Sequence, residues 1–450
     1  MSLSGTALWP LGLCPLIPCS WSYGRGRGRG RGRCRGSASS DPYVLELAES
    51  LEDSLPSSPS PLRNLRMASS EALLSTPWPS RREEPFRFTD LSFIRNSRIH
   101  PVSHPYPVTL LTPLSDLPHP LYVGPLSALS SPSLIHQVSQ FLSSSAPHHA
   151  DLFWSINGFA APDLTLVYVP QGTHLDNPIH LAYHPSHASD TMHLSNPRVL
   201  VILEKGARLH IIEDFSANHN HSYWTNAAFE ALIGEAAHLT HSYIQSQSLS
   251  AAHIKWTSVR QESSSTYQLT EVSTGAKLGR HNLHIQQLGP DTVTDLSTLH
   301  LSVGDQTQDL HSTLVLDHPR GYSRQLHKCI VAHSQGQAVF DGNIQVNRYA
   351  QQTDAGQLTR SLLLQPRATV NVKPNLQIVA HDVKCSHGAA ISDLEENQLL
   401  YFQARGIDKN TARRLLIFAF GGEVIDKFPC SSIRDTVRTQ ITNLLDPSSV

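Results

Sequence analysis

The chain has 450 residues, of which 16% are charged, and its formal net charge is −2. This length suggests two or three domains, and so few charged residues exclude a coiled coil. No apolar run reaches the ~18 residues of a membrane-spanning helix, and the near-neutral charge argues against a general nucleic-acid binder. We therefore expect neither a membrane nor a nucleic acid as partner.

The first forty residues differ from the rest because they contain six Arg and no acidic residue. An apolar run at Thr6–Trp21 is broken by three prolines, and an alternating Gly-Arg tract follows at Gly24–Gly36. A secretory signal has the opposite order, with positive charge before the apolar core. An acid-free segment rich in Arg and Ser favours an organellar transit peptide; the alternative is an arm that contacts RNA phosphates. We expect residues 1–67 to be a transit peptide and disordered leader.

The next segment, residues 68–155, is rich in Ser and Pro and has short helical patterns. A good apolar stripe lies in Ser133–Ser143, and a weaker one precedes the segment in Tyr43–Leu55. We expect a small helical N-terminal domain with long connections, and disorder in part of the chain before about residue 70.

From residue 156 to residue 390 the apolar pattern changes to a period of two. Short apolar strands such as Val199–Leu203, Leu314–Leu316 and Leu376–Val379 recur between small turns that often contain Gly. Strands that recur without intervening helices predict a mainly β unit. The regular repetition favours a right-handed parallel β-helix over a β-sandwich, flanked by small helical N- and C-terminal regions.

The last segment, residues 391–450, is predicted to form three helices. Ser392 and Glu395 have the spacing of a capping box, and Asp408 is placed to cap the second helix. Gly421-Gly422 is expected to end that second helix, and the third follows Ser432. These helices could cap the open end of the solenoid and present a docking face.

Motifs for common enzyme chemistry are missing from the sequence. There is no phosphate-binding G-x-x-x-x-G-K-[ST] loop, no G-x-S-x-G and no H-E-x-x-H. Three H-x-x-H pairs lie in the predicted strands, where positions i and i+3 point to opposite faces: His184/His187, His238/His241 and His281/His284. We interpret them as solvated strand histidines and not as zinc ligands.

One polar segment, His381–Gly388, stands out at the end of the strand region. Cys385 and His387 are two residues apart, so on an extended chain they project to the same face. A thiolate and a neutral imidazole suit a soft metal such as iron, but two ligands cannot saturate it, so a partner chain would supply the rest. Lys384 is placed to lower the thiol pKa. The alternative is a buried structural Cys beside a capping His, and Cys329 is expected to be buried in a strand.

This same region resembles the SufD branch of the SufB/SufD iron–sulfur cluster assembly family. The resemblance is carried by Lys373–Ile378 (KPNLQI), Asp382–Ala389 (DVKCSHGA), Leu399–Ile407 (LLYFQARGI), Phe86–Leu91 (FRFTDL), Tyr168–Gly172 (YVPQG) and Tyr223–Asn226 (YWTN). The SufB paralogue carries an E-H-E-A-type segment where this chain reads Cys385–Ala389, which indicates the SufD branch. The sequence departs from the family pattern at His381, where an acid is common, and at Cys329, where Gly is usual.

The resemblance implies a non-catalytic scaffold subunit of a SufBCD complex. It implies a heterodimer with a SufB-type paralogue, a SufC-type ABC ATPase bound to the C-terminal helices, and a transient iron–sulfur cluster at the SufB interface. His387 and Cys385 would be metal ligands shared with SufB, and the SufC contact would involve Asp408, Arg413, Arg414 and Ile417. The leader then indicates the plastid (chloroplast) stroma. Flavin binding, attributed to some Suf complexes, has no support in the residues.

Two other function classes remain open, a self-assembling structural solenoid without ligands and an enzyme. A β-helix lyase or hydrolase acting on polysaccharide would need clustered carboxylates along an open groove. Acidic residues within 160–390 are sparse and lie mostly at turns.

Overall fold

The structure is a computed structural model of the chain. It describes residues 41–55, 60–102, 108–112, 120–144, 150–184, 191–217 and 221–445. The Gly-Arg tract and the rest of the expected transit peptide up to residue 40 lie outside these ranges, as does His187.

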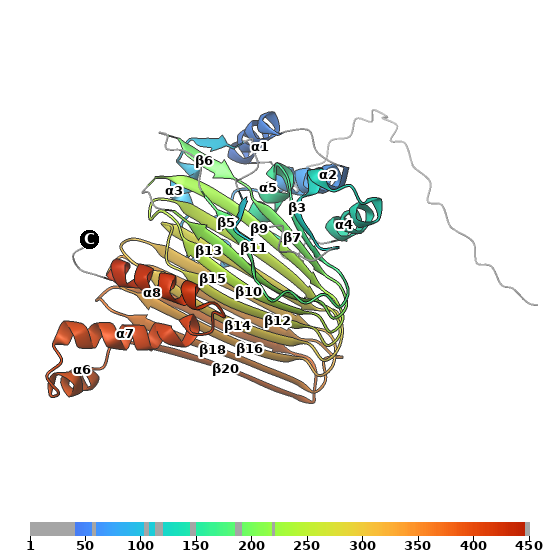
Figure 1. The fold of residues 1–450 in the computed structure, drawn as a ribbon. Helices are drawn as coiled ribbons and strands as arrows, with labels where there is room; N and C mark the ends of the chain where they lie inside the picture. Colours follow the sequence, from blue (N-terminus) through green and yellow to red (C-terminus); the bar gives the residue numbers. More distant parts are fainter. Residues whose placement is uncertain are drawn as a thin grey trace, which may run out of the picture. The chain divides into compact units, whose positions relative to one another are not determined.

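The core is a parallel β-solenoid, in which successive strands alternate between two sheets (Figure 1). The first sheet contains β4 (Thr165–Val169), β7 (Arg198–Leu203), β9 (Tyr223–Ile233), β11 (Ala252–Gln261), β13 (Leu278–Gln287), β15 (Thr307–Leu316), β17 (Gln337–Val346) and β19 (Thr369–Ile378). The second contains β5 (Ile179–Tyr183), β8 (Arg208–Ser216), β10 (His238–Ser246), β12 (Thr266–Ser273), β14 (Val293–Ser302), β16 (Tyr322–Val331), β18 (Thr353–Leu363) and β20 (Val383–Ser392). The predicted parallel β-helix is therefore confirmed.

Short strands complete the N-terminal end of the two sheets. β1 (Ile99–Pro101) and β6 (Met192–Ser195) pair in parallel with each other, and β6 also pairs with β9. β2 (Val108–Leu110) and β3 (Tyr122–Pro125) run antiparallel to β5 and β4.

The period-two pattern explains why these segments form a solenoid. Alternate residues of each strand face the inside, so Val199 and Val201 of β7 meet Leu209 and Ile211 of β8 in one apolar cluster. Tight turns join the strands, and Gly206 adopts a left-handed φ of 69° in one of them. Paired residues on neighbouring strands of one sheet are roughly 30 positions apart in sequence, so each turn of the solenoid repeats one strand–turn–strand unit.

Helices pack on the N-terminal part of the solenoid (Figure 1). They are α1 (Pro42–Ser54), α2 (Ser60–Ser75), α3 (Ser92–Arg95), α4 (Pro132–Ser144) and α5 (Leu152–Ala160), with short 3₁₀ turns at η1 (Glu84–Phe86) and η3 (Leu126–Ala128). The expectation of a disordered leader through residue 67 is wrong for α1 and the start of α2. Val44, Leu47 and Leu51 are buried in a cluster with Trp78 and Phe153. These helices form because their few apolar residues pack against the rest of the protein. The short apolar pattern in the sequence is too weak to predict that packing.

Three C-terminal helices follow the last strand: α6 (Glu396–Gln403), α7 (Lys409–Ile425) and α8 (Ser431–Leu445). Val424 of α7 and Val437 of α8 pack against Ile244, Leu299 and Ile330 on the outer face of the second sheet. The expectation that these helices cap the open end is therefore wrong, because their apolar faces cover the side of the sheet instead.

The helix boundaries confirm one further prediction and correct another. Asp408 caps α7 as expected, because its carboxylate accepts hydrogen bonds from the backbone N–H groups of Asn410 and Thr411. Ser392 forms no capping box. It is the last residue of β20, in register with Leu362, and α6 begins only after Glu395.

The Gly421-Gly422 pair does not end α7, which continues to Ile425. A Cβ atom at Gly421 would lie 3.2 Å from Cδ2 of Leu299 in β14. Gly421 therefore permits a close approach of the helix to the sheet and is not a terminator.

Candidate functional site

The last turn of the solenoid is open at its C-terminal edge. β19 and β20 end the strand order of the two sheets, and within the described ranges no other strand pairs with their outer sides. An edge of this kind presents unpaired backbone N–H and C=O groups, which can pair with a strand of another chain. We call β19, β20 and the segment 379–382 that joins them the open rung.

Cys385 and His387 lie on β20 within the open rung. Cys385 pairs in register with Ala355 of β18, and His387 with Gln357. The Cys385 side chain is half-buried and packs against the apolar cluster inside the solenoid, whereas His387 is exposed at the edge. Because the two positions are two residues apart, they share a face, as predicted.

Charges around Cys385 do not activate its thiol. Burial, together with the nearby carboxylate of Asp354, raises the pKa of Cys385 above its usual value. The prediction that Lys384 lowers this pKa is wrong, because the ammonium of Lys384 lies 3.8 Å from the Asp354 carboxylate and is paired with it. The thiol of Cys385 therefore loses its proton less readily than an ordinary cysteine thiol.

Gln351 fixes the connection that precedes β20. Its side-chain oxygen accepts hydrogen bonds from the backbone N–H groups of His381 at 3.2 Å and of Asp382 at 2.9 Å. These contacts hold the start of the strand that carries Cys385 and His387.

No group of three or more His, Cys, Asp or Glu side chains that could hold a metal ion occurs in the part of the chain that the structure describes. The open rung thus offers the pair Cys385 and His387 on β20 as potential metal ligands, with His381 and Asp382 in its connecting segment. Large apolar side chains surround them at the edge, since Ile378, Val379 and Ile391 are between 44% and 56% exposed. This combination of free backbone, apolar side chains and two ligand atoms is typical of a surface that another subunit completes.

The expected docking residues of α7 divide between two faces. Arg414 and the helix-capping Asp408 are exposed. Arg413 donates a hydrogen bond to the backbone oxygen of Leu364 at 2.7 Å and helps to hold the helix on the solenoid. Ile417 is buried against the second sheet, so its side chain is not available to a partner. A groove of about 390 Å³ beside this helix is lined by residues that include Arg413, Arg414 and Leu445.

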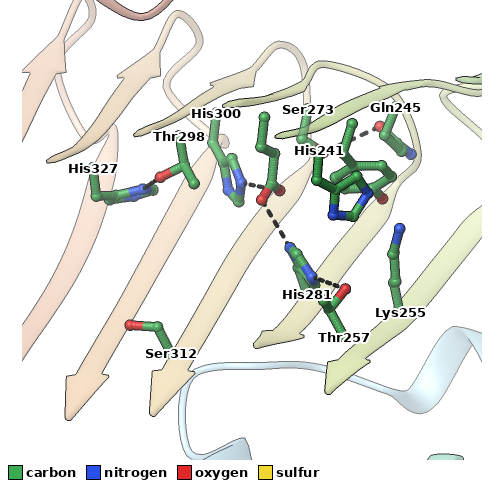
Figure 2. Close-up of polar contacts among 12 residues, drawn as sticks. His241, Gln245, Lys255, Thr257, Ser273, His281, Thr298, His300, Ser312 and His327 are labelled. Carbon is green, nitrogen blue, oxygen red and sulfur yellow. Dashed lines mark hydrogen bonds and ion pairs between the residues drawn. The ribbon is translucent and has the colours of Figure 1, made fainter. Parts of the chain in front are cut away.

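The two H-x-x-H pairs that lie within the described ranges, His238/His241 and His281/His284, project to opposite faces as predicted. The interpretation that these histidines are solvated is wrong for the inward members. His241 and His281 point into the solenoid and are buried. His241 contacts Glu213 at 2.9 Å. His281 contacts the carboxylate of Glu271 at 2.8 Å, one of the contacts drawn as dashed lines in Figure 2. The outward His284 is also buried.

These histidines belong to a row of polar side chains inside the solenoid that the sequence analysis missed. Lys255 forms a buried ion pair with Glu213. Burial works to raise the pKa of Glu213, but Lys255 and His241 outweigh it and lower the pKa to about 2. A signal was present, because His241 lies two residues from both Leu239 and Tyr243 and so shares their inward face.

The fold and the open rung together define a class of protein, a parallel β-solenoid whose last turn has no further strand paired with it in the described ranges. Residues 186–420 match the family model described as "SUF system FeS cluster assembly, SufBD core domain". The chain belongs to the SufB/SufD family of iron–sulfur cluster assembly proteins and is SufD-like.

Three relatives illustrate the similarity. "Protein ABCI7, chloroplastic" of Arabidopsis thaliana is 56% identical over 443 residues, which cover 91% of this chain and 93% of that protein. An iron–sulfur cluster assembly SufBD family protein of Synechocystis is 40% identical over 64% of this chain and 65% of its own length. "Iron-sulfur cluster assembly protein SufD" of Escherichia coli is 28% identical over 65% of this chain and 69% of its own length.

Proposed function

We propose that this chain is a scaffold subunit for iron–sulfur cluster assembly that pairs through its open rung with a SufB-type paralogue. The observation that carries the proposal is the unpaired edge of β19 and β20, with apolar residues exposed around Cys385 and His387. Addition of the partner's last turn would continue both sheets and cover these side chains.

In this proposal the nascent cluster is cargo held between the subunits. His387 supplies a neutral imidazole from the exposed edge, and the partner supplies the remaining ligands. Cys385 has a raised pKa, so it must release its proton before it can bind a metal. His387 is therefore the first ligand to engage.

We also propose that an ABC ATPase of the SufC type docks on the C-terminal helices. Asp408 and Arg414 of α7 are exposed and can contact the ATPase. The buried Ile417, together with the hydrogen bond from Arg413 to Leu364, keeps the helix on the sheet. The chain itself then contributes no ATP hydrolysis, since it has no phosphate-binding loop.

The proposed location is the plastid. The name of the Arabidopsis relative includes the word "chloroplastic", and the acid-free basic leader of this chain is consistent with a transit peptide. No helix in the described ranges is long and apolar enough to cross a membrane.

Co-expression with SufB and SufC homologues tests the function. We expect a complex that contains all three chains and that forms an iron–sulfur chromophore when supplied with iron and sulfide. Removal of residues 408–450 should abolish SufC binding, with retention of SufB as the control. A chain that stays apart from SufB would contradict the scaffold proposal.

A further inference from the structure

The groove beside α7 is enclosed by two helices and three turns of the solenoid. The face of α7 that lines it carries Asn410, Arg413, Arg414 and Ile417. These positions have the i, i+3, i+4, i+7 spacing of one helix face, so polar and apolar side chains point the same way. Leu445, at the end of α8, lines it as well. The groove is therefore built on regular elements that hold its shape.

The floor of the groove is an apolar strip made by the solenoid repeat. Val303, Ala332 and Leu364 directly follow β14, β16 and β18, and all three line the groove. The backbone N–H of Ala332 donates to the carbonyl of Ser302 at 2.9 Å, and that of Leu364 to the carbonyl of Val331 at 2.9 Å. The strip thus continues the parallel ladder. Because neighbouring strands are ~4.8 Å apart, it is roughly 10 Å long.

The polar groups that line the groove are donors, and none of the described residues in its lining is a carboxylate. Arg413 uses one nitrogen to bond the carbonyl of Leu364 at 2.7 Å, which leaves its other N–H groups available. Arg414 is exposed and makes no hydrogen bond with any residue that the structure describes. His333 accepts from the backbone N–H of Gln335 at Nδ1, so its Nε2 is available to donate.

Two carboxylates lie near the groove without lining it, and both are engaged elsewhere. Asp408 accepts hydrogen bonds from Thr411 that lower its pKa, and the charge of Arg414 adds to that shift. Asp305 pairs with Lys277 at 3.0 Å. The two guanidinium groups therefore give the lining an excess of positive charge, which favours an anion.

The pairing of an apolar strip with two guanidinium groups defines the chemistry of a ligand. A carboxylate matches the planar fork of an arginine, and an aliphatic chain would cover the strip. A small polar anion would leave the strip in contact with water, and a neutral lipid would leave the guanidinium groups without a countercharge. At ~30 Å³ for each water-sized group, the groove volume of about 390 Å³ holds roughly 13 such groups. This is the size of a medium-chain carboxylate such as decanoate.

We propose that the groove binds a free medium-chain carboxylate of the fatty-acid class. Its carboxylate is bound by Arg413 and Arg414, and its chain lies along Val303, Ala332 and Leu364. No covalent step is involved. The site goes beyond the proposed scaffold function. Because α7 is also the proposed contact of the ATPase, binding is measured on the full chain alone, so that failure of ATPase docking and failure of this proposal are distinguishable.

Calorimetric titration of the full chain with decanoate tests the site. We expect one site with a Kd below about 100 μM. 1-Decanol has the same chain without the charge and should bind at least about tenfold more weakly, and decylamine should not bind measurably. Absence of decanoate binding up to about 1 mM, or equal affinity for decanoate and 1-decanol, would overturn the proposal.

Two variants separate the charge from the apolar strip. Arg414→Gln should raise the Kd for decanoate by about tenfold and leave that for 1-decanol unchanged. Arg438→Gln is the matched control, because Arg438 pairs with Asp426 and does not line the groove. Ala332→Phe fills the strip and should abolish binding of both compounds, with an unchanged Tm as the check of its fold. A decanoate Kd that is the same in Arg414→Gln as in the wild type would refute the site.

A photoreactive diazirine analogue of decanoate locates the bound chain. Peptide mapping should place the label in residues 303–304, 332–333 or 444–445, and a label elsewhere would contradict the assignment. Removal of residues 446–450, which follow Leu445 in the sequence, should change the Kd by less than about twofold. A tenfold gain in affinity would mean that this segment of the chain, and not a free carboxylate, is the occupant of the groove.

Discussion

Lys255 is the residue on which the charge balance inside the solenoid depends. It pairs with the buried Glu213, and its ammonium lies 3.8 Å from the centre of the Tyr243 ring. Burial lowers the pKa of Lys255, and the Glu213 carboxylate opposes that shift. The charge of Lys255 is therefore stabilised by the nearby Glu213 carboxylate and not by water.

Replacing Lys255 by Met should destabilise the protein by about 3–5 kcal/mol, because Glu213 would then be a buried charge without a cation. Chemical denaturation measures the loss. The double variant Lys255→Met/Glu213→Gln should recover most of it. Lys205→Met is the control, because its ion pair with Glu235 is exposed and should contribute less than about 1 kcal/mol. Similar losses at Lys255 and Lys205 would contradict the buried-pair argument.

His387 is the exposed member of the candidate ligand pair. His387→Ala removes an imidazole from the edge without opening a cavity, so we expect folding and SufB pairing to survive. Cluster assembly should fall by about tenfold or more, as measured by the rate of chromophore formation in the reconstituted complex. His381→Ala, in the preceding turn, is the control. Wild-type rates in His387→Ala would leave this residue without a ligand role.

At the scale of elements, α7 packs closely on the second sheet because Gly421 has no side chain. Gly421→Leu should destabilise the protein by about 1–3 kcal/mol, because its Cβ would already lie 3.2 Å from Leu299. Gly422→Ala is the matched control. The nearest atom to its Cβ is 3.9 Å away, so higher helix propensity should stabilise it by up to about 1 kcal/mol. Thermal unfolding of both variants checks the contrast, and equal effects would exclude a packing role for Gly421.

The first helices give a second test at this scale. A chain that begins at Asp41 should retain the stability of the described protein. A chain that begins at Ala68 loses α1 and the buried Leu62 and Leu65 of α2, so its Tm should be lower by roughly 5 °C or more. An unchanged Tm would mean that these helices add no stability.

The strands of the solenoid were predictable because alternation is local. In Val199–Leu203 and the other strand segments, the residues of the segment itself are enough to predict a strand with two faces. The pair Cys385 and His387 was singled out from the sequence, since the two residues share a face of an extended strand whatever the fold around them, but the open edge beside them was not, because the C-terminal helices were expected to cover it. By contrast, Ser392 has a capping pattern that competes with strand pairing to β18, and the pairing prevails. Whether such a segment forms a helix cap or a strand depends on contacts between residues that are distant in the sequence. A single sequence does not reveal these contacts.

The buried histidines were not predicted for a related reason. Polar residues on strands usually face water, and the histidine count is high enough for chance pairs. Which face of β10 or β13 is the inner one depends on the whole solenoid. His241 and His281 are buried because the solenoid closes around them. His241 contacts a carboxylate on the neighbouring strand β8, and His281 contacts one on β12 of the other sheet.

At the scale of the whole molecule, the buried histidines make stability depend on pH. His253 has its pKa lowered to about 3 by burial, so it is neutral when folded but takes up a proton when unfolded below about pH 6.5. The unfolded state thus binds more protons, and stability falls as the pH falls from about 6.5 toward 3. Glu213, with its pKa lowered to about 2, adds a second loss below about pH 4.5.

Denaturation between about pH 7.5 and about pH 4 should therefore show a slope of up to ~1.4 kcal/mol per pH unit for each such histidine. His253→Gln should flatten that slope, whereas replacement of the exposed His381 should not. Stability that is constant from about pH 7.5 to about pH 5 would contradict the buried neutral state of His253.

The open rung has a consequence for how cells must supply this protein. A flat, apolar parallel edge accepts any compatible strand, including the edge of another copy or of a partly folded chain. Copies made in excess of their partner would accumulate as aggregates or be degraded. Under the proposed pairing, balanced synthesis of the two subunits, or prompt proteolysis of the surplus, is a requirement that the unpaired edge of β19 and β20 imposes on the cell.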